Sequence, residues 1–337
     1  MDSPIVAMID ETQLYDRIQH DFPLDTRPYQ RAASLLGLSE RTVLSLLARD
    51  LGNGRISRIG AVFAPNSIGT STLAALAVPP NEMKQVAERL NADPAISHNY
   101  ARTGHRYNLW FVAGARDRMM LDAVLQHIAD DVGYQPIDLP LEREYHIDLG
   151  FPLGKGREAS KPTRRAPPAS VPKPDMDECD WRLVAALEPG LSLTPEPYHA
   201  LAERCGLPLT ETLQRLQQWR KNGVIRRFGV ILHHRPFGYS HNAMCVWNVP
   251  DARVDAIGMR IASLPHVTLC YRRPRRLPNW QYNLFAMVHA RGMHELETTL
   301  SRFDAIGGLT AMPHAVLRAS HCFKQRGTRY GNIPARV

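Results

Sequence analysis

The sequence predicts an α+β protein built by tandem duplication, with a winged helix-turn-helix and a ferredoxin-like βαββαβ unit in each half. The heptapeptide GRISRIG at 54–60 returns as GVIRRFG at 223–229, a shift of 229 − 60 = 169 positions. A longer block also occurs twice, as ISHNYARTGHRYNLWF at 96–111 and as VTLCYRRPRRLPNWQYNLF at 267–285. Self-similarity at one spacing over most of a chain indicates duplicated structural units.

The repeat sets the expected domain boundaries. The first unit should span 1–153, with the winged helix over about 11–64 and the βαββαβ part over about 65–153. The second should span 175–337, with the corresponding parts over about 178–232 and 233–330. Between them, GKGREASKPTRRAPPASVPKP at 154–174 is rich in Pro, Lys and Arg and almost free of apolar residues, which predicts an extended linker.

Each half opens with apolar residues at helical spacing. In the first half they predict helices around 14–18, 29–36 and 43–47, and Ser39 can cap the third. The second half offers 183–187, 198–205 and 210–222, ending before Gly223. Three helices followed by the pattern G-x-I-x-R-x-G and a short strand predict a winged helix-turn-helix.

The remainder of each half alternates strands and helices. In the first half we expect a strand near 72–78, a helix over 81–91, the hairpin of the repeated block, a helix over 119–129 and a strand near 137–149. The second half repeats this order with helices around 254–261 and 293–303. The order βαββαβ predicts four antiparallel strands with two helices on one face of each half.

Charge and cysteine usage restrict the function classes. The net charge of +8 and pI of about 9.4 favour an acidic partner, which is nucleic acid, an anionic membrane surface or a small ligand with many carboxylates or phosphates. No apolar run reaches membrane-spanning length, and the first residues lack the pattern of a secretory signal. The five cysteines are odd in number and confined to the second half, so we expect reduced thiols in a cytoplasmic protein.

The predicted architecture resembles that of the Lrp/AsnC regulators. The segment FAPNSIG at 63–69 is similar to their connection between the winged helix and the βαββαβ domain. The chain departs from them in the hairpin, where those regulators tend to carry an acidic residue after Thr-Gly. Here Thr103-Gly104 is followed by His105-Arg106-Tyr107, and the second copy expands to RRPRR at 272–276.

These departures match another branch of the superfamily, the siroheme decarboxylases. The blocks GHRYNLWF (104–111), RRFGVILHHRPFGY (226–239), YRRPRRLPNWQYNLFAMVHARG (271–292) and CFKQRG (322–327) are similar to the fused two-subunit form of the haem d1 branch. The resemblance implies a carboxy-lyase that removes the C12 and C18 acetate carboxyl groups of siroheme to give 12,18-didecarboxysiroheme. It also implies that no organic cofactor assists, since the iron belongs to the substrate, and that other decarboxylase subunits or a second copy are the partners.

Siroheme is a flat iron macrocycle ringed with carboxylates, so its binding site needs cationic groups at the rim and aromatic surface against the ring. Arginine suits the rim because its planar fork binds carboxylate bidentately. Trp280 supplies aromatic surface. The candidate substrate-binding arginines are Arg58, Arg102, Arg106, Arg227, Arg272, Arg273, Arg275 and Arg276.

Loss of CO₂ from a pyrrole acetate leaves electrons on the side-chain methylene, so a general acid is needed near the ring. His105 is the first candidate because histidine titrates near neutral pH, and Tyr107 and Tyr282 are the alternates. A reactive carboxylate would be destabilised in an apolar pocket near Trp110, Trp280 or Phe285. Five histidines spread along the chain leave the axial iron ligand unassigned, and no protein metal site is expected: His98, His241, His289, His314 and His321.

Other interpretations stay open at this point. His105 could be a solvated tip residue that binds a propionate, the arginines of 272–276 an exposed basic loop, and Tyr107 and Tyr282 cross-strand packing residues. Arg58 and Arg227 could brace the junction between domains. A DNA-binding regulator is the rival class, although the first turns of the expected recognition helices carry Glu40 and Glu211, which would face phosphate. A third class is a haem or siroheme sensor that does not react.

Overall fold

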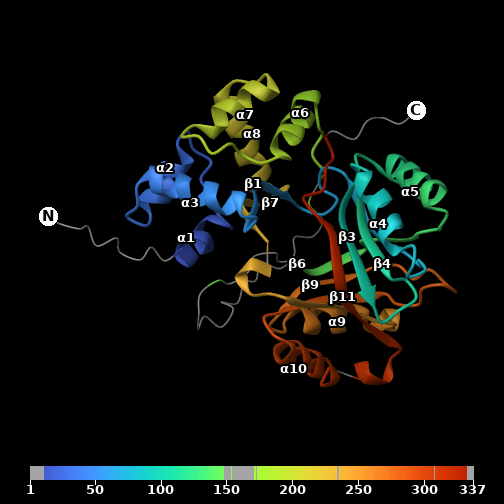
Figure 1. Cartoon of the computed structure of the whole chain (residues 1–337). Coiled ribbons are helices and arrows are strands. Elements are labelled where there is room, and N and C mark those ends of the chain that lie inside the picture. Colours follow the sequence, from blue (N-terminus) through green and yellow to red (C-terminus); the bar gives the residue numbers. More distant parts are fainter. Residues whose placement is uncertain are drawn as a thin grey trace.

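The computed structural model describes residues 11–147, 153, 171, 173–233, 235–306 and 308–331 (Figure 1). Most of the predicted linker 154–174 lies outside the described residues, as do the outer ends of both predicted units and the end of the strand predicted near 137–149. The α+β class and the two winged helices are confirmed.

Three helices open each half, as the apolar spacing predicts. The third helix of the first half begins at Ser39, whose Oγ accepts a hydrogen bond from the Thr42 amide at 3.1 Å. The first helix of the second half begins with a capping box between Asp177 and Asp180. The helices are α1 (Glu11–Ile18), α2 (Pro28–Ser34), α3 (Glu40–Gly52), α6 (Glu178–Leu187), α7 (Pro197–Cys205) and α8 (Leu209–Lys221).

The strands that follow these helices pair with each other across the two halves. In the antiparallel ribbon of β1 (Ile56–Phe63) and β7 (Ile225–Leu232), Gly60 lies opposite Gly229. A Cβ atom at Gly229 would lie 2.4 Å from the carbonyl oxygen of Ile18 at the end of α1, so only glycine fits there. The two copies of the glycine-terminated heptapeptide thus pair with each other in the ribbon. The two winged helices also share one hydrophobic core.

The rest of both halves forms a single curved sheet. Within the described residues nine strands pair in the order β5-β2-β4-β3-β11-β8-β10-β9-β6. The first half contributes β2 (Thr70–Leu76), β3 (Ile96–Thr103), β4 (Leu109–Ala115), β5 (Ile137–Pro140) and β6 (Arg143–Ile147). The second half contributes β8 (His241–Trp247), β9 (Val267–Arg272), β10 (Leu284–Ala290) and β11 (His314–Gln325).

The last strand of each half differs from the expectation of a four-stranded sheet closed within the half. The segment predicted as one strand near 137–149 is divided into β5, which pairs with β2, and β6, which pairs with β9 of the other half. Pro140 ends β5 because proline has no amide hydrogen to continue the ladder. In β11, residues 314–318 pair with β8 and 318–325 pair with β3. Each half therefore completes the sheet of the other.

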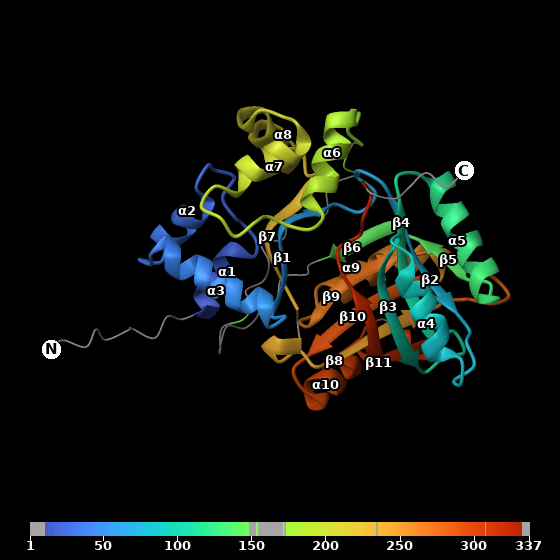
Figure 2. The ribbon, with the colours of Figure 1, turned by 45° about the horizontal axis from the view of Figure 1, so that its top comes forward.

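Helices cover only one face of the sheet (Figure 2). Helices α4 (Met83–Ala92) and α5 (Arg118–Val132) pack on the first half, and α9 (Asp251–Ala262) and α10 (Met293–Asp304) pack on the second. Side chains from the helix-free faces of both halves, among them Trp110, Tyr271 and Leu317, form one further buried cluster. None of the described helices combines the length and apolarity that crossing a bilayer requires.

Candidate active site between the two hairpin tips

The tips of the two repeated hairpins meet in space. The loop between β3 and β4 carries His105, whose ring centroid lies 5.0 Å from Trp280 and 6.0 Å from Tyr282 in the loop between β9 and β10. Tyr107 stacks on the imidazole, with 5.8 Å between the ring centroids. The predicted catalytic residues and Trp280 are therefore neighbours, although they come from both halves of the chain.

A glycine turn brings the first tip close to the other half. Gly104 has a φ of +99°, and a Cβ atom there would lie 2.3 Å from the Val316 carbonyl oxygen of β11. Any larger residue would push the tip away from the sheet. Gly104 thus allows the close approach that places His105 against the second hairpin.

The backbone fixes the tautomer of His105. Its Nδ1 atom accepts a hydrogen bond from the Tyr107 amide at 3.1 Å, so the neutral ring carries its proton on Nε2. Burial, and then the positive charge of Arg106, lower the pKa of His105 below its ordinary value. A carboxylate-bearing ligand would oppose both effects by supplying negative charge.

Aromatic side chains wall the site. Trp280 is 1% exposed and contacts Trp110 at 5.2 Å and Phe285 at 6.0 Å between ring centroids. Its indole Nε1 is buried and has no hydrogen-bond partner among the described residues. A buried indole N–H normally finds an acceptor, so this donor is available to a ligand.

Two asparagines explain the repeated Tyr-Asn-Leu sequence. In the sequence alone, this tripeptide is visible only as part of the repeat. The Asn108 side chain accepts from the Val78 amide at 3.0 Å and donates to the Val78 carbonyl oxygen at 2.8 Å. Asn283 makes the same two bonds with Val249, both at 2.9 Å. These bonds satisfy backbone groups beyond the end of the preceding strand and anchor the base of each hairpin.

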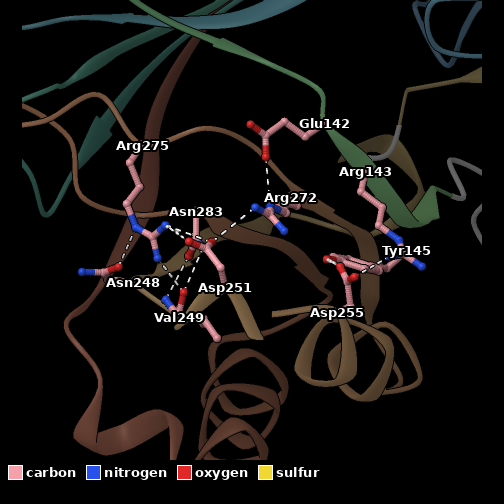
Figure 3. A network of polar contacts seen from close by, with 10 residues as sticks. All are labelled: Glu142, Arg143, Tyr145, Asn248, Val249, Asp251, Asp255, Arg272, Arg275 and Asn283. Atoms are coloured by element: carbon pink, nitrogen blue, oxygen red, sulfur yellow. Dashed lines mark hydrogen bonds and ion pairs between the residues drawn. The ribbon is translucent and has the colours of Figure 1, made fainter. Parts of the chain in front are cut away.

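Three of the predicted substrate-binding arginines form ion pairs with carboxylates of the protein. They are Arg276, whose Nη2 lies 3.8 Å from Asp138 Oδ2, and Arg272 and Arg275 (Figure 3). Arg272 contacts Glu142 at 2.9 Å and Asp251 at 3.2 Å. Arg275 contacts Asp251 at 3.1 Å and also donates to Asn248 at 2.8 Å and to the Val249 carbonyl oxygen at 2.6 Å. The Arg275 guanidinium is the main cause of the lowered pKa of Asp251. Arg272 and Arg275 therefore hold the start of the second loop to α9.

Other arginines join the second loop to the first half. Arg276 Nε donates to the Asp138 carbonyl oxygen at 2.7 Å, and Arg273 donates to the carbonyl oxygen of Leu139 in β5. At the tips, Arg106 donates to Asn279 Oδ1 at 2.7 Å. In the sequence, Arg106 is the arginine nearest to His105, and Arg276 is the arginine nearest to Trp280.

The two wing arginines lie on the β1–β7 ribbon. Arg58 donates to the Ala61 carbonyl oxygen at 2.8 Å, and a Cβ atom at Gly327 would lie 2.9 Å from its Nη2 atom. Burial and the nearby charge of Arg227 lower the pKa of Arg58 to about 10. Arg227 pairs with Val62 in the ribbon. These contacts join the ribbon to the segment that follows β11.

The site between the tips is filled by its own side chains, since Tyr107 and Tyr282 are only 6% and 7% exposed. Surface hollows of about 370 and 440 Å³ lie instead over α3, where Arg41 and Ser45 line both. They hold none of the aromatic residues of the site. No group of three His, Cys, Asp or Glu side chains that could hold a metal ion occurs in the described part of the chain.

Comparison with known proteins gives matches in both halves. The description "Siroheme decarboxylase NirDL-like HTH domain" matches residues 11–56 and 180–226. The description "AsnC-like ligand binding domain" matches residues 67–146 and 236–324. Both descriptions therefore occur twice, in agreement with the duplication.

Relatives match the chain from end to end. The siroheme decarboxylase NirDL subunit of Paracoccus pantotrophus is 40% identical over 96% of this chain and 98% of its own length. The NirD subunit of Stutzerimonas stutzeri is 51% identical over 42% of this chain and 93% of its own length. A crystal structure of siroheme decarboxylase NirDL in complex with an iron-uroporphyrin III analogue is 25% identical, with a TM-score of 0.69 over 95% of this chain and 94% of that one. The chain belongs to the siroheme decarboxylase NirDL family.

Proposed function

We propose that this protein is a siroheme decarboxylase that removes the C12 and C18 acetate carboxyl groups of siroheme, giving 12,18-didecarboxysiroheme and two CO₂ in haem d1 biosynthesis. The full-length relationship to NirDL subunits supports the activity. The observation that carries the mechanism is the contact of His105 with Trp280 and Tyr282, because it joins a proton donor to an aromatic surface suited to a macrocycle.

In each decarboxylation the carboxylate leaves as CO₂ and its bonding electrons pass to the methylene and the conjugated ring. A proton must then convert the CH₂ group into CH₃. The imidazolium form of His105 supplies it through Nε2. Loss of the remaining Nδ1 proton to solvent and reprotonation of Nε2 then restore the neutral ring, which accepts the Tyr107 amide at Nδ1. Tyr107 and Tyr282 flank the imidazole and are the alternate donors.

The aromatic wall contributes by excluding water. A carboxylate placed against Trp110, Trp280 and Phe285 loses its hydration without gaining a counter-ion, which raises its energy relative to neutral CO₂. Acid catalysis is typically worth about 10²–10⁴-fold, so this desolvation must supply part of the remaining acceleration.

Substrate binding requires the tips to separate. Trp280 now occupies the space between His105 and Trp110, and the bond from Arg106 to Asn279 joins the two tips. We expect the rim carboxylates of siroheme to replace Asn279 as the partner of Arg106 and to bind Arg276. Charge-assisted bidentate hydrogen bonds to a carboxylate are stronger than a hydrogen bond to the side-chain amide of asparagine. Arg272 and Arg275 keep their protein carboxylates in this scheme.

The reaction as written needs no organic cofactor, and the iron enters as part of the substrate. The NirL and NirD subunits of Stutzerimonas stutzeri, which are named as separate subunits, each match less than half of this chain, and we expect further decarboxylase subunits as partners. A cytoplasmic location fits the unpaired cysteines, of which Cys205, Cys245 and Cys270 are buried. DNA binding is disfavoured because Glu40 and Glu211 place carboxylates in the first turns of α3 and α8, where a recognition helix would meet phosphate.

Anaerobic incubation of the purified protein with siroheme alone, followed by mass spectrometry of the tetrapyrrole, tests the proposal. We expect loss of two carboxyl groups as CO₂ without any added cofactor. Unchanged siroheme with a shifted absorption band would indicate a sensor. Specific retardation of genomic DNA at physiological salt, together with no saturable association with siroheme, would indicate a regulator.

A further inference from the structure

Arg102 is a buried cation without a protein counter-ion. Its side chain belongs to β3, three residues before His105, and the residue is 7% exposed. Its guanidinium contacts the Leu317 carbonyl oxygen at 3.1 Å, Asn242 Oδ1 at 3.4 Å and the Met287 sulfur at 3.8 Å. The Tyr100 ring covers the guanidinium at 5.5 Å. All of these partners are neutral, and within the described ranges no carboxylate forms an ion pair with Arg102.

Such a site is unusual because buried charges are normally paired. Arg226 follows this rule. The half-buried Arg226 forms a two-pronged contact with Glu144 at 2.6 and 2.7 Å. Burial lowers the pKa of Arg273, the residue that corresponds to Arg102 in the second half, and Tyr271 and then Asp138 oppose that shift. No carboxylate is among the main groups that act on Arg102.

We propose that Arg102, Asn242 and Tyr100 form an internal seat for one carboxylate of the substrate, a carboxylate that the reaction leaves in place. This inference rests on the proposed function. An arginine stabilises a carboxylate far more than it stabilises neutral CO₂, so it opposes decarboxylation of the group it binds. The seat therefore takes a propionate or a retained acetate and sets the register of the ring, while the group that reacts lies against the aromatic wall.

Two substitutions remove the seat in opposite ways. Arg102→Met deletes the cation, and Asn242→Asp supplies the cation with a carboxylate of the protein itself. Iron uroporphyrin III, which carries acetate and propionate arms, serves as a non-reacting probe in a spectroscopic titration. We expect each variant to bind it roughly 10- to 100-fold more weakly, the loss of one charge-assisted bond.

Thermal unfolding of the ligand-free proteins separates a binding role from a structural one. Because both substitutions relieve an uncompensated buried charge, we expect the melting temperature to hold or rise. Arg226→Met is the matched control, and it should lower the melting temperature because it leaves Glu144 without its partner. Wild-type affinity in Arg102→Met, with a fall in melting temperature like that of the control, would overturn the proposal. If Arg102→Met fails to fold, unchanged affinity in Asn242→Asp overturns it.

Turnover gives an independent readout. A seat for a retained carboxylate predicts that both variants raise KM for siroheme at least about tenfold while kcat at saturation changes much less. A variant with unchanged KM and a large loss of kcat would show that Arg102 acts on the reacting group instead. The titration with iron uroporphyrin III tests the seat even if siroheme is not decarboxylated, so failure of the seat and failure of the proposed function are distinguishable.

Discussion

The two hairpins have the same base and different tips. At the base, Asn108 and Asn283 bind the backbone of Val78 and Val249 in the same way. Arg102 and Arg273 each donate to the carbonyl oxygen of a leucine in another strand, β11 for Arg102 and β5 for Arg273. At the tip, the first hairpin turns tightly at Gly104, whereas the second extends from 273 to 283. The two bases are alike because both must satisfy the same backbone hydrogen bonds. The two tips differ in length and in the side chains that they carry.

The divergence assigns different tasks to the two halves. The first tip carries His105, the group able to move a proton. The second tip carries Trp280 and is held to α9 by Asp251, which binds Arg272 and Arg275 (Figure 3). In the proposed mechanism the first half supplies the acid, and both halves contribute to the aromatic wall, with Trp110 from the first and Trp280 and Phe285 from the second.

The strongest test of this division is removal of the acid. His105→Ala should lower kcat by about 10²–10⁴-fold, because general acid catalysis is typically worth that much. The measurement is single-turnover decarboxylation of siroheme under anaerobic conditions. His127→Ala, which changes an exposed histidine on α5, is the control and should keep full activity. Full activity of His105→Ala would transfer the role to Tyr107 or Tyr282.

The pH dependence of the rate sharpens the same assignment. Burial and Arg106 lower the pKa of His105, so the protonated donor is the minor form near neutral pH and becomes more abundant as the pH falls. We therefore expect kcat/KM, which reports the ligand-free enzyme, to rise about tenfold for each pH unit of acidification until the pKa is reached. The slope should be absent in His105→Ala. A flat wild-type profile between about pH 6 and 8 would contradict an imidazolium donor.

Because the two hairpins share the same base, replacing the asparagine of either one should lower the free energy of unfolding, by different amounts. Asn283→Ala and Asn108→Ala each leave one amide and one carbonyl without partners, and each unsatisfied group costs about 1–3 kcal/mol when buried. Asn283 is 1% exposed, whereas Asn108 is only half-buried and water can replace part of its bonding. Urea unfolding should therefore show the larger loss for Asn283→Ala. Equal losses would mean that the two bases are equivalently buried in solution.

The smallest expected effect concerns the anchor of the second loop. Asp251→Asn should lower kcat/KM about 3- to 10-fold, because a looser loop holds Trp280 less well. Its effect on stability should stay below about 1 kcal/mol, since the Asp251 side chain is 61% exposed and water screens its ion pairs. Asp255→Asn removes the contacts with Arg143 and Tyr145 outside the loop and is the matched control. Equal kinetic losses in both variants would refute a positioning role for Asp251.

Local sequence patterns predicted the helices and strands well, but they did not predict strand pairings and ion pairs between residues distant in sequence. The helix expected over 81–91 is α4 (Met83–Ala92), because its apolar stripe is a local property. The pairing of β6 with β9 was missed, since nothing near residues 143–147 specifies a partner in the other half. Arg272 and Arg275 looked free because Asp251 lies 21 and 24 residues before them, on another element.

The hairpin tips show that the residues of the candidate site could be predicted from the sequence, but their contacts could not. His105, Tyr107, Trp280 and Tyr282 were chosen by residue type, and the structure brings them together through a contact between the halves. The absence of a counter-ion at Arg102 is a three-dimensional property and leaves no trace in the sequence. The two asparagines were visible in the repeat, but their backbone partners were not.

The exchange of final strands between the halves has a consequence for assembly. If β11 and β6 were withdrawn, β3 and β9 would each present a row of unpaired amides and carbonyls, and such an open edge invites aggregation. Joining both halves in one polypeptide makes the effective concentration of the complementary half independent of dilution. Covalent fusion thereby keeps the two halves, and the hairpin tips that they carry, in a one-to-one ratio.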